Sequence, residues 1–147
     1  MGARRVITSG LTVGTRLPAY LTSHGRVQLA ALADDELDAY LARVTLEPRT
    51  AKTTTDPEQL RVRLMEVRRR GFALVDQELE EGVTSVAVPV RDGDGKVVAS
   101  VNVGTQSRRH TPAALQRMAL DPLLETAVRI ERDMMLLGIR RIGPGQV

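Results

Sequence analysis

The stretch TSVAVPVRDGDGKVVASVNVG, residues 84–104, decides the fold class of this chain of 147 residues. Two valine-rich runs flank the turn sequence DGDG (92–95), a pattern typical of a β-hairpin. The acids of this turn have the spacing of calcium ligands, but the residues that follow lack the further ligands and the bidentate Glu of an EF-hand loop. We therefore predict a hairpin of strands 84–92 and 96–104.

The segments around this hairpin supply the remaining elements. Further strands are expected over 4–13 and 72–78, where β-branched and apolar residues gather. Helices are expected over 22–32, capped by Thr22 or Ser23, over 34–44, capped by Asp34, and over 56–71, with Asp56 as cap, Pro57 in the first turn and Gly71 as stop. A last helix opens at Thr111-Pro112 and restarts at Asp121-Pro122, and residues 138–147 are expected to form a disordered tail. The order predicts an α+β fold with helices against one antiparallel sheet.

The composition narrows the function classes. Hydrophobic residues make up 42% and charged residues 27%, so the chain can bury one ordinary globular core. The lack of cysteine excludes disulfides and thiol catalysis, and two histidines are too few for a His-rich metal site. We expect no cofactor. No apolar run reaches about 18 residues and no signal peptide is visible, so we expect a cytoplasmic protein without membrane contact.

Two charged runs have both a structural and a functional interpretation. RRR (68–70) ends a predicted helix, where cations favour the helix dipole, and a phosphate or DNA contact is the alternative. QELEE (77–81) ends a predicted strand, and its carboxylates suit acid–base chemistry. No nucleophile, zinc or phosphate-loop motif accompanies them. We therefore expect no enzyme, and a small enzyme remains only a third hypothesis.

A group of polar residues near the start of the first helix is a candidate anion site. Ser23, His24 and the N-terminal backbone N–H groups of helix 22–32 suit a carboxylate, and Arg16 suits a bidentate clamp. The structural alternative is an arginine and a histidine that merely lie on the surface. Asn102 lies on one strand face with Ser100 and Gly104, because side chains alternate along a strand. Such residues on a buried face need partners, for which a ligand is one source; a solvated face explains them equally well.

Three segments together resemble the effector-binding domain of IclR-type bacterial transcription regulators. They are VGTRLPAYLTSHGRVQLAAL (13–32), LRVRLMEVRRRGFALVDQELEEGVTSVAVPVRDGDGKVVASVNVG (60–104) and LLETAVRIERDM (123–134). The resemblance runs from about residue 4 to residue 135. TVGTRLPAY (12–20) and VDQELEEG (75–82) are most similar to the branch that controls aromatic-acid catabolism through the β-ketoadipate pathway. The resemblance implies that residues 1–147 form a GAF-like effector-binding domain, a curved antiparallel sheet with helices packed against it.

The resemblance also implies which residues line the effector site. The matching positions are Ser23, His24, Val75, Ser85, Asn102 and Gly104, with the adjacent Asp76 as a further candidate, and Arg16 is our addition as carboxylate clamp. Family members that respond to glyoxylate or pyruvate have an acid at the position of Val75 and serines at those of Asn102 and Gly104. These departures favour a larger acid of the protocatechuate, 4-hydroxybenzoate or β-ketoadipate class.

The resemblance finally implies partners. We expect a ligand-sensing and oligomerising module of a transcription regulator, present as a homo-oligomer, either dimer or tetramer. Family members carry a helix-turn-helix domain and first sheet strands that are missing here, so we expect an incomplete domain that contacts DNA only through that absent part. The alternative is a structural or oligomerisation fragment that binds no effector.

Overall fold

The computed structural model describes residues 10–139. The strand predicted over 4–13 therefore lies mostly outside the described residues, and its remainder, residues 10–13, is not a strand. Most of the predicted tail, residues 140–147, also lies outside them. No helix of the described part is both long enough and apolar enough to cross a membrane.

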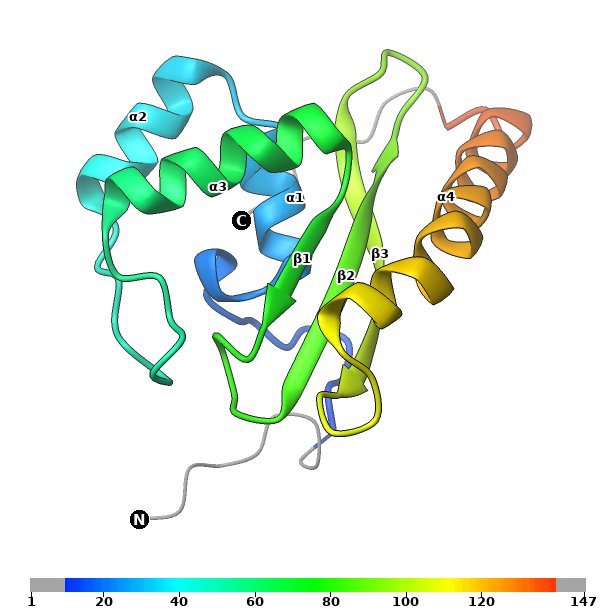
Figure 1. The fold of residues 1–147 in the computed structure, drawn as a ribbon. Helices are drawn as coiled ribbons and strands as arrows, with labels where there is room; N and C mark the ends of the chain where they lie inside the picture. Colours follow the sequence, from blue (N-terminus) through cyan, green and yellow to red (C-terminus); the bar gives the residue numbers. More distant parts are fainter. Residues whose placement is uncertain (1–9, 140–147) are drawn as a thin grey trace.

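An antiparallel sheet of three strands occupies the centre of the described structure (Figure 1). The strands are β1 (Ala73–Asp76), β2 (Val83–Arg91) and β3 (Val97–Gln106), in the order β1-β2-β3. The predicted hairpin is confirmed, because β2 and β3 pair antiparallel. In the turn of this hairpin, the Asp92 carboxylate accepts from the N–H groups of Asp94 and Lys96, each at 3.0 Å. Gly95 has a φ of 79°, which suits glycine in such a turn.

Three helices lie on one side of the sheet, where the first of them contacts the strands directly, and one helix covers the other side (Figure 1). The first group comprises α1 (Ser23–Ala30), α2 (Asp34–Arg43) and α3 (Pro57–Arg70), preceded by the short helix η1 (Ala19–Leu21). The predicted ends of α3 are confirmed, with Asp56 as cap and Gly71 in the left-handed conformation. The predicted cap of α2 is wrong by one residue. Ala33 is the N-cap, and the Glu36 carboxylate accepts from its N–H at 3.1 Å.

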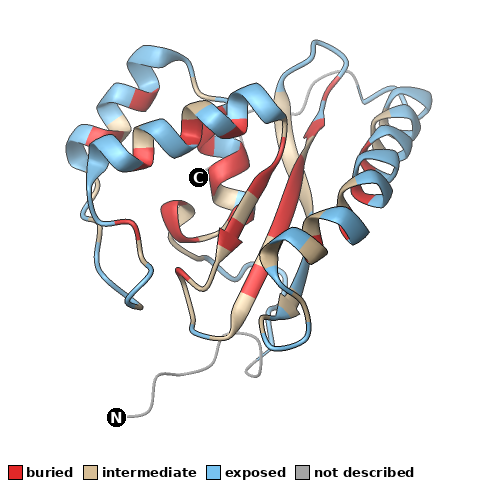
Figure 2. Ribbon diagram, in the orientation of Figure 1, coloured by how far each residue is buried: buried red, intermediate tan, exposed pale blue. Residues whose placement is uncertain are grey.

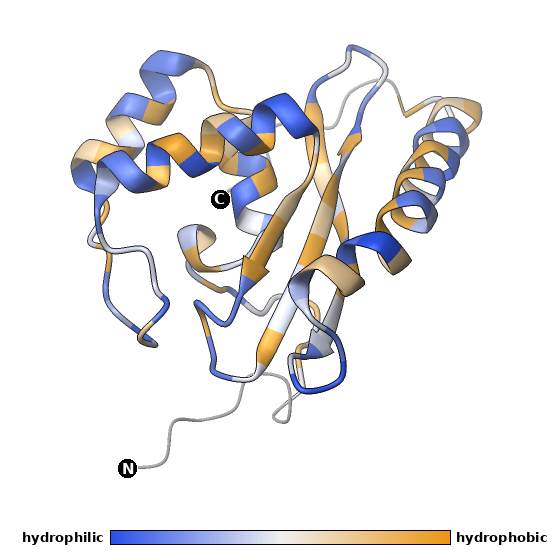
Figure 3. Cartoon of the chain, in the orientation of Figure 1, coloured by the Kyte–Doolittle hydropathy of each residue, from blue (hydrophilic) through white to orange (hydrophobic). Residues whose placement is uncertain are grey.

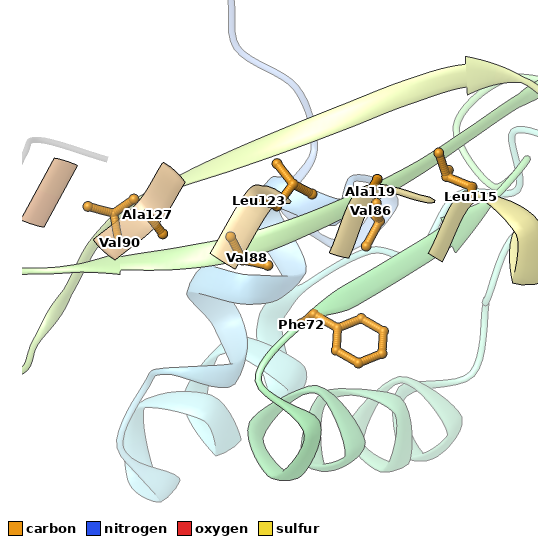
Figure 4. Packing of buried hydrophobic residues seen from close by; sticks show 8 residues of the cluster. All are labelled: Phe72, Val86, Val88, Val90, Leu115, Ala119, Leu123 and Ala127. Carbon is orange, nitrogen blue, oxygen red and sulfur yellow. The ribbon is translucent and has the colours of Figure 1, made fainter. Parts of the chain in front are cut away.

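The helix α4 (Pro112–Leu136) runs without interruption through Pro122, so the predicted restart at Asp121-Pro122 is wrong. An internal proline costs a helix about 3 kcal/mol, so packing must offset it. The apolar stripe that does so lies on both sides of the proline and meets β2 (Figure 4); its helix members are Leu115, Ala119, Leu123 and Ala127.

The core is divided between the two faces of the sheet, and Figure 2 shows buried residues on the strands and on the helices beside them. On the α4 side, Phe72 and three valines of β2 pack against the helix stripe. On the other side, Val27 and Ala30 of α1 meet Ala73 and Ala87 of the sheet. Figure 3 shows the matching pattern, hydrophobic strands beside helices that alternate hydrophobic and hydrophilic residues. The sheet thus has helices packed on both faces. The contacts of Val27 and Ala30 hold α1 against the face opposite α4.

The three arginines at the end of α3 have partners within the chain. Arg68 forms an ion pair with Asp34 at 2.8 Å. It also donates to the backbone carbonyls of Ala30, the last residue of α1, and of Leu32 in the segment that follows. Arg70 lies over the ring of Phe72 and within 3.6 Å of Glu66. These contacts favour the structural interpretation of the run over a phosphate contact.

Candidate ligand site

The N-terminal turn of α1 lies against the sheet with its polar residues. Thr22 caps the helix by accepting from the Gly25 N–H at 2.9 Å. Ser23 is 1% exposed although it is polar, so its hydroxyl must find its partner inside the protein. That partner is Ser85 of β2, whose hydroxyl donates to the Ser23 oxygen at 2.8 Å. The capped helix end is therefore bound to the centre of the sheet.

His24 reaches the neighbouring strand. Its Nδ1 lies 2.6 Å from the hydroxyl oxygen of Ser100 on β3. Partial burial lowers the pKa of His24 below its ordinary value, and the side chain of Asn102 acts in the opposite direction. The free site therefore holds a neutral imidazole near neutral pH.

The strand register shows which candidates share this face. Val75 pairs with Ser85, and Ser85 pairs with Gly104, so the three lie in one row across the sheet. In the next row on the same face, Asn102 pairs with Ala87. Val75 is buried, while Asn102 and Gly104 are exposed. We use the name α1 polar cluster for the following set of residues on this face: Ser23, His24, Val75, Ser85, Ser100, Asn102 and Gly104.

Asp76 lies on the opposite face from this cluster. It follows Val75 along β1, and its carboxylate accepts from the Thr84 hydroxyl and pairs with Lys52, both at 2.7 Å. Burial acts to raise its pKa, but these contacts outweigh burial and lower it. The structure gives Asp76 a role at the end of the strand pair and does not bring it to the other candidates.

Arg16 precedes the cluster on an exposed segment that leads into η1. It forms no ion pair with any residue in the range 10–139. The structure thus leaves the guanidinium available for an external carboxylate without placing it against the cluster.

The alternation along the strand predicts that Ser100 shares a face with Asn102 and Gly104. Its contact with His24 spans 76 positions, so no local pattern identifies it as a ligand-site residue. Sequence reasoning also missed the pair beneath the cluster. Arg26 is 2% exposed and forms two contacts with the Glu78 carboxylate, at 2.7 and 2.8 Å. Glu78 belongs to the acidic run QELEE, and this internal pairing favours a structural role over catalysis. The sequence signal for this pair is Arg26 itself, a charged residue that stands among the apolar residues of the predicted helix 22–32.

A hollow lies on the side of the sheet opposite the α1 polar cluster. It has a volume of about 370 Å³ and lies between β3 and α4, with mostly apolar walls. Its lining residues include Val103, His110, Met118 and Pro122. Its size falls in the range of small-molecule pockets, but it offers few convergent polar groups. No group of three or more potential metal ligands occurs in the described part of the chain.

Residues 2–132 match the family model described as bacterial transcriptional regulator IclR C-terminal. The chain belongs to the IclR family of bacterial transcriptional regulators. An IclR relative from Pseudomonas putida, named Pca regulon regulatory protein, is 47% identical over 125 residues. The match covers 85% of this chain and 43% of that relative, so the chain spans less than half its length.

Two solved structures of transcription regulators are similar to this chain. A transcriptional regulator from Rhodococcus sp. RHA1 is 44% identical with a TM-score of 0.84, covering 87% of this chain and 52% of that one. A double mutant of the PobR inducer-binding domain from Acinetobacter, in complex with 3-hydroxybenzoic acid, is 32% identical with a TM-score of 0.77, covering 82% and 69%. The predicted IclR fold is confirmed, and the relatives are named as regulators, which confirms the expectation that the chain is not an enzyme.

Proposed function

We propose that this chain is the effector-sensing part of an IclR-type regulator, and that its effector is a small aromatic or dicarboxylic acid. The observation that carries the proposal is the α1 polar cluster, where the buried Ser23 accepts a hydrogen bond from the partly buried Ser85 beside His24. Hydroxyls, an imidazole and a helix N-terminus are the groups that bind a carboxylate. Val75 adds an apolar wall suited to a ring or a carbon chain.

The names of two relatives support the aromatic class. One is a regulator of the Pca regulon, and the other was solved with 3-hydroxybenzoic acid. Protocatechuate and 4-hydroxybenzoate combine a carboxylate with a ring hydroxyl, so they match a cluster that offers separate polar contacts. A ligand of about eleven heavy atoms, at roughly half the best efficiency per atom, gains about 8 kcal/mol, which is micromolar affinity.

The proposed mechanism is a shift between arrangements of subunits. A homo-oligomer that binds the effector better in one arrangement than in another moves toward the first when the acid is present. In the whole regulator this shift changes the spacing of the DNA-reading domains. This chain supplies the sensor and part of the subunit contact.

The experiment is thermal unfolding followed by far-UV circular dichroism, with and without a panel of acids, because the chain has no tryptophan. We expect protocatechuate or a close analogue to raise the melting temperature by several degrees, since saturation at 100 times Kd adds roughly 2.7 kcal/mol. Arg16→Ala and Asn102→Leu should each reduce the shift. If no aromatic or dicarboxylic acid moves the transition, the alternative of a structural fragment is favoured.

A further inference from the structure

We propose that the buried Arg26–Glu78 pair is a positioning pair, which holds the first turn of α1 so that Ser23 and His24 face the sheet at a fixed distance. This inference rests on the proposed function, because it concerns the same cluster. It adds two residues that do not touch the effector but determine the geometry of those that do. The contacts of each partner carry the argument.

Arg26 ties α1 to two other segments. Its Nε donates to the carbonyl of Tyr20 at 2.9 Å, and its two terminal nitrogens contact both oxygens of Glu78. The planar guanidinium therefore fixes both the direction and the distance of the contact, which a lysine would not do. Arg26 lies one helical turn after Ser23, so a shift of Arg26 moves Ser23 with it.

Glu78 is equally constrained. The Thr54 hydroxyl and backbone N–H both donate to its Oε1, at 2.6 and 2.8 Å, and the Thr53 hydroxyl donates to its carbonyl at 2.7 Å. The carboxylate thus connects α1 to the loop before α3 and to the segment after β1. Burial acts to raise the pKa of Glu78, but Arg26 and Thr54 outweigh burial and lower it. The pair stays charged near neutral pH and keeps its bidentate form.

Removal of a buried pair is a more informative test than removal of one partner. Glu78→Gln leaves a buried arginine charge uncompensated, and this variant can fail to fold. The double variant Arg26→Met/Glu78→Leu removes both charges, and well-packed apolar replacements of buried pairs commonly keep a protein folded. Thr54→Val weakens the same network by one hydrogen bond. Asp34→Asn is the matched control, since it breaks the ion pair with Arg68 beyond the other end of α1.

The experiment has two readouts for the chain and its variants. The first is the proton NMR titration of the ring of His24, with His110 as internal reference, because these are the two histidines of the chain. The second is the Kd for protocatechuate by isothermal titration. We expect the double variant to raise the pKa of His24 toward its ordinary value and to weaken binding about tenfold or more, because the cluster is no longer preorganised.

Thr54→Val should change both readouts in the same direction by about twofold to threefold in Kd, and it decides the question if the double variant does not fold. Asp34→Asn should leave both unchanged. A folded double variant whose His24 titration and Kd equal those of the parent overturns the proposal. If the parent binds neither protocatechuate nor any other acid of the panel, the proposed effector class fails, while the His24 titration still decides whether the pair positions the cluster.

Discussion

Gly25 lies so close to the preceding short helix that no side chain fits. A Cβ at this position would overlap the carbonyl group and the Cα of Ala19. We expect Gly25→Ala to push α1 away from η1 and to lower the free energy of unfolding by about 1–3 kcal/mol, as overpacking commonly does. Chemical denaturation measures this value.

Gly104→Ala is the matched control at the same cluster. Its Cβ would lie 3.9 Å from the Thr84 carbonyl oxygen and 4.0 Å from the Ser85 Cβ, which is ordinary contact. This variant should unfold like the parent. Equal losses at the two glycines would show that the close approach at Gly25 does not matter.

His24 gives the site a predictable pH dependence. A carboxylate beside the ring favours the imidazolium form, so binding takes up a proton wherever free His24 is neutral. Because the pKa of free His24 is lowered, affinity should rise as the pH falls from about 8 toward that pKa, by at most one factor of ten per pH unit. The slope should level off at lower pH. Isothermal titration at several pH values measures it.

Two histidine variants separate proton uptake by His24 from proton uptake by other groups of the chain. His24→Gln should give a flat profile over the same range, whereas His110→Gln should keep the slope of the parent. His110 lies across the sheet, beside the hollow under α4. A slope that survives His24→Gln would assign the proton uptake to another group.

Among the secondary-structure elements, the sequence predicts best those features that depend on residues within about one helical turn. The α3 helix was predicted nearly to the residue, because Asp56, Pro57 and Gly71 each act within one turn. The period of two also placed Asn102 and Gly104 on one face. The contact of Ser23 with Ser85 spans 62 positions, and that of Arg26 with Glu78 spans 52, so local patterns could not show either.

The course of α4 shows the opposite case, in which packing outweighs a local signal. Pro122→Ala should restore a helical N–H and remove the ring clash, so we expect it to raise the stability by about 1–3 kcal/mol. Pro112→Ala is the control, because proline is tolerated at the first helical position. Thermal unfolding compares the two. A Pro122→Ala variant that is less stable than Pro112→Ala would mean that the proline ring itself supports the fold.

For the molecule as a whole, we expect α4 to supply the contact with a second copy. Leu124, Val128 and Met135 are exposed along one side of the helix, at the spacing that paired helices use. Glu125 and Arg132 flank them, so an antiparallel second α4 would bring opposite charges together. We expect sedimentation of the parent to show a dimer or larger species, and Val128→Lys to shift it toward monomer.

Val62→Lys is the control for this surface. Val62 is a similarly exposed valine, 67% against 62% for Val128, but it lies on α3 across the sheet from α4. This variant should sediment like the parent. Equal effects of the two lysines would place the subunit contact elsewhere or show a general effect of charge.

The assignment of the α1 polar cluster as the effector site is tested most directly by a titration of the parent chain with protocatechuate. The ring protons of its two histidines are followed by NMR. His24 belongs to the α1 polar cluster, and His110 lines the hollow between β3 and α4, so each face of the sheet carries one reporter. We predict that the His24 resonances move in a saturable way while those of His110 stay in place. Movement of His110 alone would place the acid on the α4 side and contradict the assignment of the α1 polar cluster as the effector site.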